Sequence, residues 1–160
     1  MRVEAPIKVD RKTKKLAKRL SAGEIAVINH IDIDEVAANS LVERKIKLVI
    51  NAAPSISGRY PNKGPKILID NNILIIDNVG ENVFEELKEG QVIEVNNGQI
   101  YRDGQFIGSG EVMDKSVVEK RTQIAYENMS VELDRFIDNT IEYAKREKGF
   151  ILGETEIPKM

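Results

Sequence analysis

The chain has 160 residues, 31% of them charged, and a net charge of −2 at pH 7, so bulk electrostatics do not favour binding to a polyanion such as nucleic acid. It has no cysteine and one histidine, which excludes disulfides and a cysteine nucleophile and argues against a zinc site. Its apolar runs are far shorter than the ~20 residues that a membrane-spanning helix needs, so we expect no membrane segment here and a cytoplasmic location.

The first 21 residues are expected to form a basic arm and helix. Residues 1–9 should be extended. Asp10 can cap a helix over 11–20 that has one buried face, made of Thr13, Leu16, Ala17 and Leu20. The opposite face carries six lysines and arginines. It could contact membrane phosphate, nucleic acid or an acidic partner, but a solvated face is the preferred interpretation.

A strand–helix–strand pattern is expected from residue 22. Apolar runs predict buried strands at 25–28, 48–51 and 73–76. Helices are predicted over 36–44, over 65–71 and from Glu81 or Asn82 to the stop at Gly90. The carboxylates of 32–35 should cap the first helix, with Val36, Ala37, Leu41 and Val42 inward. Asn97-Gly98 then predicts a tight hairpin between 92–95 and 99–101, and 105–107 should add a further strand.

From residue 114 the pattern becomes that of one long helix. Ser116–Glu119 is read as a capping box, and the helix is expected to run to Lys148 and stop at Gly149, a length of roughly 50 Å. Its apolar stripe comprises Ala125, Met129, Leu133, Phe136, Ile137, Thr140, Ile141 and Ala144, and a second seven-residue series comprises Val117, Ile124 and Val131. A helix this long cannot bury such a stripe on its own domain, which favours dimerisation or docking to a following domain. The alternative is a helix folded back across the sheet.

The stretch from Asn51 to Pro65 is the main candidate site. It follows a buried strand and holds three prolines and two glycines, and a loop of that length in a compact domain is usually functional. It sits where open α/β sheets gather ligands, and its hydroxyls, guanidinium, ammonium and free N–H groups suit an anion. With three residues expected at the same edge, the candidate ligand-binding set is Asn51, Ser55, Ser57, Gly58, Arg59, Tyr60, Asn62, Lys63, His30, Asp32 and Asp77. The alternative is a rigid turn that only shapes the surface.

Two family resemblances add expectations. The phrase NNILIIDNVGENVFEELKEGQVIEVNNGQIY resembles the end of the swivelling phosphohistidine domain of phosphoenolpyruvate-utilising enzymes, over roughly residues 22–110. That resemblance implies an α/β fold, a three-layer β/β/α swivelling-type domain over 22–113 with a β-hairpin end, followed by the long C-terminal helix of 114–149. Where that family has its Ser-His-Ala-Ala segment, this chain has residues 60–65 without histidine and with Lys63 near its place, so no catalytic residue is carried over.

The second resemblance covers the whole chain. The phrases VDRKTKKLAKRL, NAAPSISGRYPNKGP, LIIDNVGENVFEELKEG and FIDNTIEYAKREK resemble the N-terminal part of SteA-like bacterial proteins, which are linked to the cytokinetic ring. In that family a thiamin-pyrophosphokinase-like domain follows the long helix, and a membrane-anchoring segment usually follows that domain. The resemblance implies that this chain is an N-terminal fragment without a cofactor, that residues 150–160 are a linker to the missing domain, and that the full-length relatives are membrane-anchored.

Three functions follow from these patterns. The first is a non-catalytic regulatory or assembly module acting in bacterial cell division or envelope processes, with a homodimer or a docked domain on the long helix and a protein partner at the division site. The alternative is a ligand-binding or catalytic site for a small phosphorylated anion on the 54–65 loop, serving a nucleotide- or thiamin-related kinase-like domain. The third is a phosphoryl carrier with His30 as acceptor, although a lone histidine after a strand is more often a structural hydrogen-bonding residue. Whether the fragment is an enzyme is left open, with a non-enzyme favoured.

Overall fold

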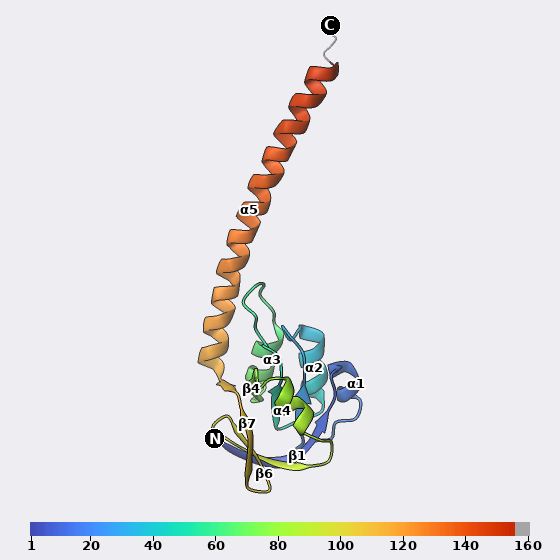
Figure 1. Cartoon of the computed structure of the whole chain (residues 1–160), viewed down its shortest axis with the longest axis vertical. Coiled ribbons are helices and arrows are strands. Elements are labelled where there is room, and N and C mark those ends of the chain that lie inside the picture. The colour runs from blue at the N-terminus through green and yellow to red at the C-terminus, as the bar shows by residue number, and fades with distance from the viewer. Residues whose placement is uncertain (156–160) are drawn as a thin grey trace.

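The computed structural model describes the backbone of residues 1–155 and the side chains of residues 1–148, and the linker expected over 150–160 lies largely outside them (Figure 1). The fold is mixed α/β: an eight-stranded sheet in the order β7-β6-β5-β1-β2-β3-β4-β8, with four short helices and one long one. The strands are β1 (Arg2–Val9), β2 (Ile25–Ile28), β3 (Leu48–Asn51), β4 (Leu74–Asp77), β5 (Val92–Asn96), β6 (Gln99–Arg102), β7 (Gln105–Ser109) and β8 (Glu111–Met113). The helices are α1 (Thr13–Ala17), α2 (Glu35–Glu43), α3 (Gly64–Asp70), α4 (Glu81–Glu86) and α5 (Lys115–Thr155).

Strand β1 lies in the middle of the sheet. It pairs in parallel with β2, where Ile7 lies opposite Ile25, and antiparallel with β5, where Ala5 lies opposite Ile93. The expected N-terminal arm is therefore extended, as predicted, but it is built into the sheet. The reason is its alternation: Ala5 and Ile7 are buried, whereas Arg2, Glu4 and Pro6 are exposed.

The parallel strands β2, β3 and β4 carry α1, α2 and α3 on one face. All four residues of β2 and of β3 are buried, which is typical of strands covered on both faces. Leu16, Leu41 and Leu68, one from each helix, are completely buried in the apolar cluster beneath them. The predicted inner face of α1 is confirmed, although the helix covers fewer residues than expected.

A second apolar cluster lies on the opposite face of the same strands. It joins Ile50 and Ile76 to Val83, Phe84 and Leu87, the inward residues predicted for the fourth helix, and to the inner residues of β5 and β6. The domain thus has one core on each face of its parallel strands.

The sheet curls so that its two ends approach each other. A single residue, Gly110, joins β7 at one end of the strand order to β8 at the other. Its N–H donates to the carbonyl of Gly98 at 2.9 Å, and a Cβ there would lie 2.6 Å from the carbonyl oxygen of Asp77. Only glycine allows this approach, so Gly110 is a packing residue. The short strand β8 was not predicted.

The hairpin between β5 and β6 is confirmed. Asn97 and Gly98 have φ of 50° and 87°, as a tight hairpin turn requires, and Asp103-Gly104 repeats the geometry between β6 and β7. The carboxylate cap predicted within 32–35 is confirmed, because Asp34 accepts from the N–H of Ala37, but Val36, predicted to face inward, is 75% exposed. Two other predicted helix starts are wrong: Asp114 rather than Ser116 caps α5, and α1 begins after Lys12 rather than at a cap by Asp10.

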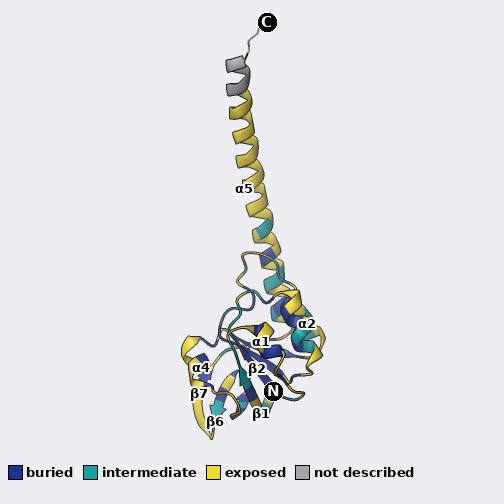
Figure 2. Ribbon diagram, turned by 90° about the vertical axis from the view of Figure 1, so that its right-hand side faces the viewer, coloured by how far each residue is buried: buried dark blue, intermediate teal, exposed yellow. Residues whose placement is uncertain are grey.

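Helix α5 leaves the domain and continues away from it (Figures 1 and 2). Val118 and Ala125 are buried against the sheet domain, but the large apolar residues from Val131 to Tyr143 are exposed. The alternative of a helix folded back across the sheet is therefore wrong. The predicted stop at Gly149 is also wrong, because the helix continues to Thr155.

Candidate functional site

The 51–63 loop lies at the carboxyl end of β3 and is held against the segment that follows β2. Asp32 and Ile33 donate backbone hydrogen bonds to the carbonyls of Pro54 and Ser55, and Gly64 donates to the carbonyl of Ile33 at 3.1 Å. A Cβ on Gly64 would lie 2.3 Å from that same carbonyl oxygen, so the return of the loop into α3 requires glycine. The prediction that this loop and residues 30–32 share one edge of the sheet is confirmed.

Asn51 organises the base of the loop. Its side chain is completely buried, and its amide donates to the carbonyl of His30 and to the hydroxyl of Ser55, both at 2.8 Å. Its carbonyl oxygen accepts from the N–H groups of His30 and Ala53 at 3.0 Å. With both ends of the amide occupied, Asn51 has no group left for a ligand.

Asp77 joins the loop to the long helix. Its carboxylate is 1% exposed, accepts from the N–H of Ser55 at 2.9 Å, and lies 3.9 Å from the guanidinium of Arg121 on α5, which also pairs with Glu111. Burial raises the pKa of Asp77, and hydrogen bonds from Ser55 and the charge of Arg121 partly oppose that rise. Because Ser55 and Asp77 are both buried, a substrate cannot reach this hydroxyl–carboxylate pair.

The remaining polar side chains of the loop base also bond within the protein. Asp32 accepts from the N–H of Ser57 at 2.6 Å and from its hydroxyl at 2.8 Å. The amide of Asn62 donates to the carbonyls of Ile33 and Ser55, and its Oδ1 is buried without a hydrogen-bond partner. These residues hold the shape of the loop. That is the role expected under the alternative interpretation, in which the loop is a rigid turn.

His30 is part of this edge through its backbone, but its ring turns toward α1. Its Nδ1 lies 2.9 Å from the hydroxyl of Thr13, which is itself buried. The ring thus has a structural partner on α1, and the contacts found among residues 1–148 do not join it to the exposed part of the loop.

Four of the candidate residues are exposed: Ser57, whose hydroxyl is bonded to Asp32, and Arg59, Tyr60 and Lys63. The guanidinium of Arg59 lies 5.7 Å from the centre of the Tyr60 ring. Within the part of the chain whose side chains are described, neither Arg59 nor Lys63 takes part in an ion pair. These residues are free to meet an anion, and they form the exposed tip of the loop.

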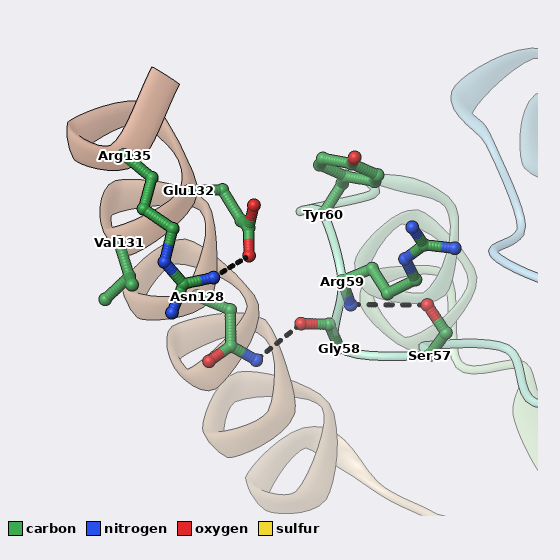
Figure 3. A pocket seen from close by; sticks show the side chains of 8 residues that line it. All are labelled: Ser57, Gly58, Arg59, Tyr60, Asn128, Val131, Glu132 and Arg135. Carbon is green, nitrogen blue, oxygen red and sulfur yellow. Dashed lines mark hydrogen bonds and ion pairs between the residues drawn. The ribbon is translucent and has the colours of Figure 1, made fainter. Parts of the chain in front are cut away.

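The tip borders a groove of about 390 Å³ against α5, shown in Figure 3. Asn128 crosses its floor and donates to the carbonyl of Gly58 at 2.7 Å, while Glu132 and Arg135 form an ion pair at 3.1 Å on the helix side. The side chain of Arg59 extends from the loop away from α5 in this view. The groove therefore does not gather its two arginines around one point.

Sequence reasoning missed the helix side of this arrangement. Arg121, Asn128 and Arg135 recur every seven residues and so fall on one face of α5. Arg121 meets the sheet at Asp77, Asn128 meets the loop at Gly58, and Arg135 lines the groove beside the loop. The seven-residue spacing is visible in the sequence, but the segments that these residues face are decided by contacts between distant parts of the chain.

The basic face of α1 is partly used inside the domain. Arg11 pairs with Glu81, and Arg19 pairs with Glu89 and with Asp10 at 3.2 Å. The hydrogen bond from Arg19 is the main reason that the pKa of Glu89 is lowered. These pairs fix α1 to neighbouring segments.

A second exposed feature is the outer half of α5. Six large apolar side chains on it are about half exposed or more: Val131, Leu133, Phe136, Ile137, Ile141 and Tyr143. Single exposed apolar residues are ordinary, whereas a series along one helix is a candidate interaction surface.

Neither a metal site nor a membrane span is found in the described part of the chain. Residues 1–148, whose side chains are described, contain no group of three or more histidine, aspartate or glutamate side chains placed to hold a metal ion. None of the helices in the same range is long and apolar enough to cross a bilayer. No protein-family model matches the chain, and no curated protein matches it.

Proposed function

We propose that this chain is a non-catalytic assembly module, the N-terminal part of a SteA-like bacterial protein that acts in cell division or envelope processes. In this proposal the sheet domain positions the long helix, and the helix joins two copies of the protein. The thiamin-pyrophosphokinase-like domain of that family would follow α5, beyond this chain.

The support for the family assignment is the set of sequence phrases given above. The two apolar cores on opposite faces of the parallel strands are in keeping with a three-layer β/β/α domain of the swivelling type. The segment that would carry the phosphohistidine in that type has no histidine, and His30 is engaged by Thr13, so phosphoryl transfer receives no support.

One observation carries the assembly function: α5 exposes its apolar stripe once it has left the domain. Phe136 is 66% exposed, and Leu133 and Ile137 are each 49% exposed. Burying a side chain of this size is worth roughly 1.5–3 kcal/mol, so covering the stripe would supply enough free energy for association. The loop offers less support for a binding function, because most of its polar groups already have hydrogen-bond partners within the protein.

Light scattering coupled to size exclusion tests this proposal. The wild-type chain should be dimeric at micromolar concentration, and Phe136→Glu should shift it toward monomer, because a carboxylate would be buried at the interface. Lys145→Gln is the matched control: it makes the same change in net charge on the opposite face of the helix, and it should remain dimeric. A wild-type chain that stays monomeric at the highest concentration reached would overturn the proposal.

A second candidate function rests on the tip of the loop. Arg59 and Lys63 are exposed cations without ion pairs among the described residues, and a guanidinium with a nearby ammonium can bind a phosphate group. Thermal-shift titration with inorganic pyrophosphate tests this, since a ligand raises the melting temperature according to its excess over Kd. Arg59→Ala should abolish the shift, and Arg44→Ala, at the end of α2 on the opposite edge of the sheet, should keep it. No shift in the wild type would remove this candidate.

A further inference from the structure

The outer half of α5 has its charges separated along its length. Between residues 127 and 142 there are five acidic residues and one basic residue, Arg135. Between 143 and 148 there are three basic residues and one acidic residue, Glu147. Two such helices therefore attract each other when they run in opposite directions and repel when they run in the same direction.

The charges flank the apolar stripe at regular positions. Leu133 and Thr140 lie one heptad apart on the stripe, as do Phe136 and Tyr143. Glu132 and Arg146 lie two heptads apart along one border of that stripe, with Asn139 midway between them. The border therefore changes from negative to positive about a central asparagine.

The direction of the stripe also limits where a partner can lie. Val118 and Ala125, which belong to the same face of the helix, are buried against the sheet domain. From Val131 to Tyr143 the large apolar side chains are exposed, so among the described residues a second helix can cover only the part of α5 that extends past the domain (Figure 2).

We infer that two copies of this chain pair through the outer half of α5 in antiparallel orientation, centred close to Asn139. Leu133 then packs against Tyr143 of the partner subunit, and Phe136 packs against Thr140 of the partner subunit. In the same register Glu132 meets Arg146 of the partner subunit on the border of the stripe. This inference rests on the proposed assembly function and adds the direction and register of pairing.

A parallel pair fits the charges poorly. It would place Glu132 and Asp134 of both copies at one level and Arg146 and Lys148 of both copies at another, which concentrates like charges. In the single chain Glu132 pairs with Arg135 at 3.1 Å, but both side chains are more than half exposed, so this pair is weak and can be shared or exchanged.

Disulfide trapping tests the orientation, because the chain has no cysteine of its own. Leu133→Cys and Tyr143→Cys, purified separately with tags of different size, should form a mixed disulfide when combined, since a disulfide needs Cα atoms within about 7 Å. Each variant alone should give little linked dimer. Efficient linking of Leu133→Cys to itself, with none in the mixture, would overturn the antiparallel arrangement and leave the assembly function intact.

A charge exchange gives an independent readout. Glu132→Arg should raise the dimer Kd by roughly tenfold, because two attractions per dimer become two repulsions of up to about 1 kcal/mol each. Arg146→Glu should have a similar effect, and the double variant should recover the wild-type Kd. Glu127→Arg, on the opposite face, is the control and should change Kd by less than about threefold.

A double variant that dimerises no better than either single variant would overturn the proposed register. If the wild type itself shows no dimer by light scattering, the assembly function fails as well, and the two failures are thereby distinguished.

Discussion

The 51–63 loop and the outer half of α5 differ in how much of their chemistry is already used. The loop is rich in polar groups, but those of Asn51, Ser55 and Asp77 already form hydrogen bonds with one another and with the backbone. The outer helix is rich in apolar groups that have no partner within residues 1–148. Polar residue types alone therefore do not identify a binding surface, whereas side chains without an intramolecular partner do.

The largest expected effect is on the base of the loop. Asn51→Ala should lower the free energy of unfolding by about 3–5 kcal/mol, because it leaves partly buried backbone groups of His30 and Ala53 and the buried Ser55 hydroxyl without partners. Urea denaturation measures this. Asn82→Ala, an exposed position on α4, is the control and should change stability by less than about 0.5 kcal/mol. An equally mild effect at Asn51 would mean that the loop is not held from its base.

The next effect concerns the return of the loop into α3. Gly64→Ala should cost about 2–3 kcal/mol, because the added Cβ meets the carbonyl of Ile33, a backbone group that cannot rotate away. The same denaturation assay applies, with Lys63→Ala at the neighbouring exposed position as the reference. An unchanged midpoint for Gly64→Ala would contradict the close approach of these two segments.

A smaller, pH-dependent effect is expected at Asp77. Its folded-state pKa is raised, so the folded protein binds a proton there more readily than the unfolded chain does. The wild type should therefore gain stability relative to Asp77→Asn as the pH falls through that raised pKa toward the ordinary aspartate value. Melting temperatures of both proteins between pH 7 and pH 4 measure the difference. A difference that stays constant, or that shrinks on acidification, would contradict the raised pKa.

The smallest effect on folding is expected at the outer helix. Phe136→Gln should change the stability of the dilute protein by less than about 0.5 kcal/mol, because the side chain is largely exposed when no partner covers it. The dilution series itself is the control, since the effect should grow as the protein concentration rises. A large loss at every concentration would mean that Phe136 packs against its own domain.

These contrasts also explain what the sequence could predict. β2 and β3 were predictable because strands buried on both faces read as continuous apolar runs, and the β5–β6 hairpin because Asn97-Gly98 dictates a turn locally. Residues 1–9 were predicted as an extended arm and not as a central strand, because the outward residues of β1 are mostly charged and its second partner, β5, lies far along the chain. β8 was missed because three residues carry almost no periodicity.

The sequence predicted which residues lie together at the site, but not which groups each of them binds. The residue types and the shared edge followed from strand order, so the loop, Asp32 and Asp77 were correctly brought together. The sequence does not predict which groups pair. The side chain of Asn51 could face a ligand or Ser55, and the distances between segments far apart in the chain decide between the two. The helix residues Arg121 and Asn128 escaped notice for the same reason.

The central place of β1 has a consequence for synthesis. A ribosome makes β1 before the other elements of this domain, yet β5, which closes its antiparallel side, is made only after β2, β3 and β4. Until then one edge of β1 is an open template for strand pairing with other chains, which is a known route to aggregation. The nascent protein thus passes through a vulnerable interval, and a chaperone that shields an extended N-terminal segment would shorten it.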